Sequence, residues 1–361
     1  MNPFIVCATR SMRTYASQVI ECLSKYLSFS KITDQINGLE LLNTDIFADG
    51  EMEVSVNASI RGKDVIIFSS CARNEAGVDV EEAKVELYHA VDALIRCQAR
   101  RIIIFEPFIS CSRSDRTTRR SSVGLWVHLK TLSALGARHI VTFQLHSDKS
   151  KTMLDPSICA IDDIPALTLL KKHLCDNYIK TLSSLEGEVR NNWAFCSVDA
   201  GGEKLARIFA NSFGAPLVVA HKQRDYSKPN TVESINILSA EPVEGKTLWI
   251  VDDMIDTAGS VEKLIRTLAL LKPKEINIVS VHALFSHPAV EKLQALSREG
   301  LLRRTIVTDT VCCNNFSDLI SDLEVVPSAE LASKIVKAII NNESMSKLLR
   351  NFDASIYLGD K

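Results

Sequence analysis

The chain alternates short, continuous apolar runs with longer segments in which apolar residues recur every three or four positions. The run from Leu248 to Val251 predicts a buried parallel strand, and the periodic segment from Ser260 to Leu271 predicts the helix behind it. Ligands of sheets built in this way bind beyond the carboxyl ends of the strands. Polar residues that directly follow a predicted strand are therefore the first candidates for a functional site.

One unit of strand, helix and strand occurs twice. The first copy comprises 61–69, 80–98 and 101–108, and the second comprises 244–251, 260–271 and 274–281. Both copies carry Gly-Lys just before the first strand, at Gly62 and Gly245, although short motifs also match by chance. Each copy has the form of a right-handed crossover between parallel strands. The pattern predicts an α/β protein with two duplicated domains, each a doubly wound, mainly parallel sheet flanked by helices.

The domain join is predicted at 155–165, where Pro156, Asp162, Asp163 and Pro165 interrupt the regular pattern. We expect an N-terminal domain over 1–160, a C-terminal domain over 161–345 and a tail over 346–361. The segment 328–340 is strongly amphipathic and predicts a helix near the end of the second domain.

Composition narrows the functional classes. The 361 residues are 46% hydrophobic and carry a formal net charge of −2, which does not favour nucleic acid as a partner. The ten cysteines contain no Cys-x-x-Cys pair, so reduced core thiols are expected and zinc at Cys312-Cys313 is not. Arg10 and Arg13 precede any apolar leader, and no run approaches the roughly 20 apolar residues of a membrane span. A soluble, cytoplasmic protein without membrane association is expected.

The most informative motif follows the predicted strand 248–251. The carboxylates of Asp252 and Asp253 would repel a phosphate, so they are expected to accept hydrogen bonds from sugar hydroxyls, directly or through a divalent cation. The small residues next to the helix start leave backbone amides open to a phosphate; the turn comprises Asp256, Thr257, Ala258, Gly259 and Ser260. The alternative is an acidic strand end with Asp256 or Thr257 as helix N-cap.

Two other predicted strands also end in polar residues. His146 follows the strand 140–145, near a cation or phosphate, although a lone histidine is more often structural. Asp199 follows the strand 193–198 and precedes Gly201, Gly202 and a helix, a pattern that fits a metal-phosphate site and a simple cap equally well.

Two further segments carry candidate ligand groups. Lys222 and Arg224 follow the strand 215–220 and precede a polar loop. Their positive charges are placed to offset charge that develops in a transition state; the alternative is that both side chains are simply solvated. Phe47, Asp49 and Glu51 place an aromatic ring beside two acids, which suits a nucleobase; alone, the pentapeptide is only a turn.

Taken in order, these segments resemble ribose-phosphate pyrophosphokinase, also called phosphoribosyl pyrophosphate synthetase. The resemblance covers nearly the whole chain and rests on 47–51, 61–65, 113–115, 145–146, 199–202, 221–224, 251–260 and 283–286. It implies phosphoribosyltransferase-like domains, Mg²⁺, and transfer of the pyrophosphoryl group of ATP to the anomeric hydroxyl of ribose 5-phosphate for nucleotide biosynthesis. It also implies a homo-oligomer, either a dimer or a hexamer.

The resemblance implies a role for each candidate. Lys222 and Arg224 would stabilise the transition state, Asp252 and Asp253 would hold the ribose hydroxyls, and 256–260 would hold the 5-phosphate. ATP would contact the N-terminal domain through Phe47, Asp49, Glu51, Arg113, Asp115 and His146, and Mg²⁺ would bind His146 and Asp199.

Two positions depart from the family pattern. Gln144 replaces an acid and Ser114 replaces a glutamine, while Asp155 remains available near the metal. These changes leave open a catalytically weak or inactive regulatory subunit of a synthetase. A phosphoribosyltransferase is a third possibility, although it would not need the motif at 47–51.

Overall fold

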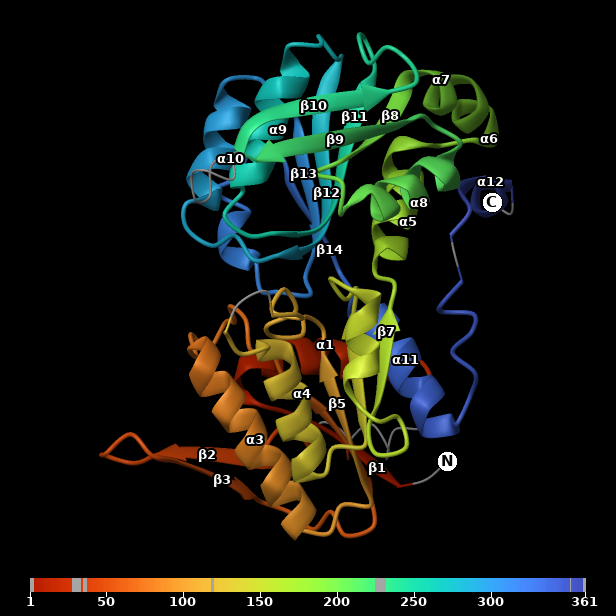
Figure 1. Cartoon of the computed structure of the whole chain (residues 1–361). Coiled ribbons are helices and arrows are strands. Elements are labelled where there is room, and N and C mark those ends of the chain that lie inside the picture. Colours follow the sequence, from red (N-terminus) through yellow and green to blue (C-terminus); the bar gives the residue numbers. More distant parts are fainter. Residues whose placement is uncertain are drawn as a thin grey trace. The chain divides into compact units, whose positions relative to one another are not determined.

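The computed structural model describes residues 3–27, 34, 38–117, 120–224, 232–350 and 352–359. The chain divides into two compact units (Figure 1). Unit 1 comprises Met1–Pro165, Thr310–Cys312 and Pro327–Arg350, and unit 2 comprises Ala166–Asp309, Cys313–Val326 and Asn351–Lys361. In the described residues, no helix is long and apolar enough to cross a membrane.

Unit 1 is built on a sheet of five parallel strands in the order β1-β4-β5-β6-β7. The strands are β1 (Phe4–Ala8), β4 (Asp64–Phe68), β5 (Arg101–Glu106), β6 (His139–Phe143) and β7 (Ala160–Ile164). Strands β1 and β4 are buried throughout, as expected for parallel strands covered on both faces.

Helices cover both faces of this sheet. They are α1 (Arg13–Leu23), α3 (Val80–Arg96), α4 (Gly124–Leu135) and α11 (Ala329–Asn341), with the short 3-10 segments η1 (Arg10–Met12) and η2 (Asp148–Met153). Ile5, Val65 and Ile67 belong to the same apolar cluster as Leu87 of α3 and Leu129 of α4. The intervening strand residues face the other way, where Phe68 packs on Tyr15 of α1 with ring centroids 5.9 Å apart. The sheet of unit 1 is therefore doubly wound.

An antiparallel hairpin extends from unit 1. It consists of β2 (Leu42–Ile46) and β3 (Met52–Val56) and projects away from the parallel sheet (Figure 1). The predicted turn at 47–51 joins its two strands, with the Gly50 amide donating to the Phe47 carbonyl at 2.9 Å.

Unit 2 contains seven strands in the order β10-β9-β8-β11-β12-β13-β14, all parallel except β10. They are β8 (Trp193–Ser197), β9 (Leu217–Arg224), β10 (Val232–Ser239), β11 (Thr247–Ile255), β12 (Glu275–Ala283), β13 (Arg304–Thr308) and β14 (Leu323–Val326). The main helices are α5 (Leu167–Tyr178), α8 (Glu203–Phe213), α9 (Gly259–Ala269) and α10 (Ala289–Arg298). The shorter helical segments are α6 (Leu182–Ser184), η3 (Leu185–Val189), α7 (Arg190–Asn192), η4 (Asn314–Phe316) and α12 (Ala354–Gly359).

These helices again lie on both faces of the sheet. Leu248 and Ile250 of β11 share an apolar cluster with Leu264 of α9 and Leu293 of α10. On the opposite face, Phe195 of β8 packs on Phe209 of α8, with ring centroids 5.5 Å apart.

The backbone supports the duplication inferred from Gly-Lys. Gly62 and Gly245 both adopt positive φ, at 72° and 71°, which glycine tolerates without a steric penalty. Their amides donate to the carbonyls of Gln98 and Lys272, each at 3.0 Å. Strand order also repeats, because β1-β4-β5-β6-β7 matches β8-β11-β12-β13-β14, with β9 and β10 added in unit 2.

Three features differ from the sequence-based expectation. The segment 155–165 does end at the boundary between the units, after Pro165, but it is not irregular, since it contains β7 paired with β6. Lys222 and Arg224 lie within β9 and not after it. The helix α11 belongs to unit 1, although 161–345 was expected to form one C-terminal domain.

Candidate active site

Asp252 and Asp253 lie near the carboxyl end of β11, in the middle of the sheet of unit 2. The sequence placed them after the strand, but β11 continues to Ile255, and Asp252 pairs in register with Ser280 of β12. Asp253 is buried and Asp252 is half-buried. The Asp253 amide donates to Asp252 Oδ1 at 3.0 Å, which fixes the orientation of the first carboxylate.

A third acid adds to the negative charge of this pair. Asp199 is the second residue after β8, the strand beside β11, and its Oδ1 accepts the Gly202 amide at 3.1 Å. Burial raises the pKa of Asp252 well above its ordinary value, and the neighbouring charges of Asp253 and Asp199 raise it further. Hydroxyl donors or a bound cation would relieve the repulsion between these carboxylates.

The turn after β11 has the conformation expected of an anion-binding helix start. Ala258 adopts a left-handed conformation with φ of 55° at the N-cap of α9, and α9 begins at Gly259. The N-cap position is thus occupied by Ala258, whose side chain cannot accept a hydrogen bond, and not by Asp256 or Thr257 as in the alternative. Thr257 and Ser260 are exposed, and Asp256 is half-buried. The first amides of a helix have no carbonyl partner within it, which is the property that anion-binding helix starts use.

Lys292 was missed by sequence reasoning. It lies on α10, and its Nζ donates to the Thr257 carbonyl at 3.3 Å and lies 3.8 Å from Glu262. A Cβ at Gly259 would lie 3.3 Å from the same Nζ, so the ammonium group is close to the turn backbone. Nothing in the sequence connects Lys292 with the turn, because the contact depends on how α10 packs beside α9.

Phe47, Asp49 and Glu51 lie in the turn of the hairpin of unit 1. All three are exposed, and 50% of the Phe47 surface is accessible. Asp49 Oδ1 accepts the Glu51 amide at 3.1 Å, which orders the turn. A large aromatic ring held on an ordered, projecting turn is available to stack on a ligand or another surface.

Arg113 and Asp115 lie between β5 and α4. Arg113 is exposed and Asp115 is half-buried. Ser114 between them has a structural role, because its Oγ accepts the amide of Gly124, the first residue of α4, at 2.9 Å. The Ser114 carbonyl accepts the next amide, that of Leu125, at 3.2 Å. Serine at this position therefore stabilises the start of α4.

His146 is exposed and follows β6, as predicted. Gln144 adopts positive φ, at 44°, and its amide donates to the Ile164 carbonyl at 3.0 Å. Asp163 of β7 accepts the Leu145 amide at 2.9 Å and pairs with Lys151 at 3.3 Å. Its pKa is raised by burial. The carboxylate of Asp163, which sequence reasoning treated only as a break, therefore anchors the residue before His146.

The structure links the remaining candidate residues less closely to the sites described above. Asp155 is exposed, and hydrogen bonds from Ser157 lower its pKa, so its carboxylate serves a local turn. The two expected metal ligands belong to different units, His146 to unit 1 and Asp199 to unit 2. The backbones of Lys222 and Arg224 pair with Ile235 and Val232 of β10. Their side chains lie outside the described part of the structure.

Two α/β units, one of which has an acidic strand end and a small-residue turn before a helix, are typical of phosphoribosyltransferase-type enzymes. Residues 160–295 match the family model of the phosphoribosyl transferase domain. Residues 4–136 match that of the N-terminal domain of ribose phosphate pyrophosphokinase.

Comparison with individual proteins narrows this class. The ribose-phosphate pyrophosphokinase of Bacillus caldolyticus is 32% identical and aligns over 80% of this chain and 84% of its own. That of Fusobacterium nucleatum is 29% identical over 89% and 95%. The crystal structure of phosphoribosylpyrophosphate synthetase from Mycobacterium smegmatis superposes with a TM-score of 0.76 at 25% identity, covering 94% of this chain and 99% of that one. The chain belongs to the ribose-phosphate pyrophosphokinase family of enzymes, which confirms the resemblance noted in its sequence.

Proposed function

We propose that the chain transfers the pyrophosphoryl group of ATP to the anomeric hydroxyl of ribose 5-phosphate, forming phosphoribosyl pyrophosphate and AMP for nucleotide biosynthesis. The observation that carries the proposal is the acidic end of β11, where Asp252 and Asp253 precede a small-residue turn and the start of α9 at Gly259. Hydroxyl acceptors and phosphate-binding amides occur there in the order in which a sugar phosphate presents its groups.

The chemistry mainly requires positioning and charge neutralisation. Asp252 and Asp253 orient the ribose hydroxyls, and the amides of 256–260 hold the 5-phosphate. Lys222 and Arg224 offset the charge that develops on the transferred phosphoryl group. Asp199 and His146 are each proposed as a protein ligand of Mg²⁺, which would neutralise the phosphates of ATP when bound. Adenine is assigned to Phe47, Asp49 and Glu51, with Arg113 and Asp115 contributing from another subunit.

A product assay tests this proposal. Purified protein with ATP, Mg²⁺ and ribose 5-phosphate should release AMP in step with phosphoribosyl pyrophosphate, and no ADP. Asp252→Asn should lower the rate strongly, whereas Asp318→Asn, which changes an exposed acid elsewhere in unit 2, should not. Absence of AMP at every Mg²⁺ and phosphate concentration, in protein that still binds ATP, would instead identify a regulatory subunit.

The role of Lys222 is tested separately. Lys222→Ala should lower kcat about 100-fold or more while changing the KM for ribose 5-phosphate little, because its contribution is assigned to the transition state. Lys263→Ala, which removes an exposed lysine on α9, serves as the control. Steady-state kinetics with both substrates distinguish the two effects. A rise in KM with unchanged kcat would contradict the assignment.

The oligomeric state and the cellular location of the protein are also proposed from the family relationship. A homo-oligomer, either a dimer or a hexamer, would complete an adenine site at the exposed Phe47, and light scattering of the purified chain measures its mass. A cytoplasmic location is proposed on the same basis, and fractionation of the source cells tests it.

A further inference from the structure

A buried group of three chemically unlike side chains lies in unit 1 and has no part in the proposed reaction. Cys71 follows β4, Glu106 ends β5, and His128 lies in α4. Their exposed fractions are 2%, 0% and 1%. Strands β4 and β5 are parallel neighbours, so Cys71 and Glu106 meet at the carboxyl edge of the sheet, under α4.

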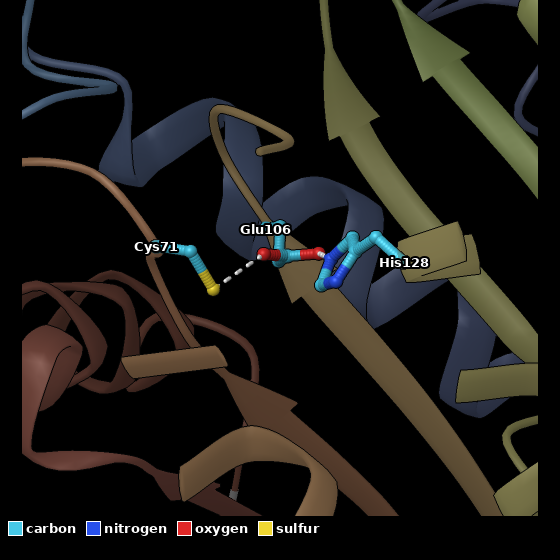
Figure 2. A group of neighbouring side chains, drawn as sticks. All are labelled: Cys71, Glu106 and His128. Carbon is cyan, nitrogen blue, oxygen red and sulfur yellow. Dashed lines mark hydrogen bonds and ion pairs between the residues drawn. The ribbon is translucent and has the colours of Figure 1, made fainter. Parts of the chain in front are cut away.

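The potential ligand atoms of the three side chains lie close together. Glu106 lies between the other two, with Oε1 3.4 Å from Cys71 Sγ and Oε2 2.8 Å from His128 Nε2 (Figure 2). One sulfur, one carboxylate oxygen and one imidazole nitrogen all lie within 4.8 Å of one another. Zinc bonds of about 2.0–2.3 Å place neighbouring ligands of a tetrahedral site roughly 3–4 Å apart, close to this spacing.

We propose that Cys71, Glu106 and His128 form a binding site for a borderline-soft divalent metal, Zn²⁺ in the first instance. A thiolate and an imidazole favour Zn²⁺ over the Mg²⁺ used with ATP, which prefers oxygen ligands. Three protein ligands leave one tetrahedral position for water. Metal binding releases the Cys71 thiol proton to solvent, and it replaces the two hydrogen bonds to Glu106 with bonds to the metal.

Tyr88 supplies a hydrogen-bond partner for the metal-binding histidine. Its hydroxyl lies 2.9 Å from His128 Nδ1, the imidazole nitrogen that does not face Glu106. When Nε2 binds the metal, the remaining ring proton lies on Nδ1 and is donated to the tyrosine oxygen. Partners of this kind hold a metal-binding histidine in the correct orientation and tautomer.

The nearby cation has other partners. Lys84 of α3 pairs with Glu81 at 2.6 Å and donates to Cys111 Sγ at 3.4 Å. In the described structure the hydrogen-bond partners of the Glu106 carboxylate are Cys71 and His128. A divalent cation would therefore compensate a buried carboxylate and join the ends of β4 and β5 to α4.

Cobalt titration tests the site. The full-length protein, freed of metal by a chelator and kept reduced, is titrated with Co²⁺ while the near-ultraviolet thiolate-to-cobalt band is recorded. We expect a band that saturates at one Co²⁺ per chain and disappears when Zn²⁺ is added. Cys71→Ser should abolish it, while Cys97→Ser, which changes an exposed cysteine, should leave it unchanged.

Two further measurements make the outcome independent of the folding of one variant. Tyr88→Phe should weaken Co²⁺ binding about 10–100-fold, the usual effect of losing an outer contact. Wild-type protein purified without chelator from zinc-supplemented cells should contain one Zn²⁺ per chain by elemental analysis. A wild-type protein without the cobalt band and without zinc, or a folded Cys71→Ser variant that keeps the band, would overturn the proposal and leave a closed hydrogen-bond network.

Discussion

At the scale of single residues, the site of unit 2 is electrostatically costly to fold. The carboxylates of Asp252 and Asp253 lie close together, with Asp199 nearby, and the pKa of Asp252 is raised. The raised pKa of Asp252 therefore opposes folding. This cost is complete above the raised pKa and disappears only when the pH falls below the ordinary pKa of the carboxyl. A carboxylate that lowers the stability of the protein in this way is expected to bind a ligand.

Asp252→Asn should stabilise the protein without ligand while it lowers activity. The gain should be about 0.5–2 kcal/mol, as for other changes that relieve a functional site. It should be larger at pH 8 than at pH 5, because the cost of the raised pKa is small near the ordinary pKa of the carboxyl and grows as the pH rises above it. Thermal melts at both pH values without Mg²⁺ check this, with Asp318→Asn as control. Equal shifts at the two pH values would contradict the prediction.

At the scale of elements, local sequence patterns predicted strands and helices, but they did not predict which distant segments pack against one another. The apolar run 248–251 and the small-residue turn 256–260 predicted β11, its turn and α9, because both signals are local in sequence. Lys292, Asp163 and the group of Cys71, Glu106 and His128 were not predicted, because each depends on packing between distant segments.

The contact of α10 with the turn before α9 gives one prediction. Lys292→Gln should raise the KM for ribose 5-phosphate about 5-fold, on the order of 1 kcal/mol for a partly exposed charge. The KM for ATP should change less. Lys263→Gln is the matched control. An unchanged KM for ribose 5-phosphate in the Lys292→Gln variant would show that Lys292 only stabilises the turn and does not contribute to binding.

The start of α4 gives another prediction. Ser114→Ala removes the acceptor of the Gly124 amide and should lower the free energy of unfolding by about 0.5–2 kcal/mol. The KM for ATP should remain close to that of wild type, because Ser114 is engaged by the helix. Denaturant unfolding and kinetics measure the two quantities, with exposed Ser122→Ala as control. A large change in KM with unchanged stability would instead place Ser114 at the nucleotide.

At the scale of the whole molecule, the fold class, the duplication and the family were all predicted from the sequence. The unit to which α11 belongs was not, because an amphipathic pattern shows that a helix is buried on one side and not what covers it. In the structure, α11 packs beside α1, and Ser328 Oγ lies 2.7 Å from the Tyr15 hydroxyl.

The position of α11 predicts where a core mutation acts. Ile335 is fully buried, so Ile335→Ala should destabilise unit 1 by about 2–5 kcal/mol. Hydrogen exchange should accelerate in α1 and β1 and much less in α8 and β8. Ile356→Ala, at a position 63% exposed on α12, is the control. Faster exchange confined to unit 2 would contradict the assignment of α11.

The assignment of α11 to unit 1 also bears on synthesis at the ribosome. The five strands of unit 1 are complete by Ile164, but α11 is translated only after nearly all of unit 2. At the usual rate of 5–20 residues per second, the apolar surface beside α1 remains uncovered for about ten seconds or longer. The nascent chain therefore presents a surface for chaperones during this interval, and a message truncated before α11 would yield an N-terminal unit that remains incomplete.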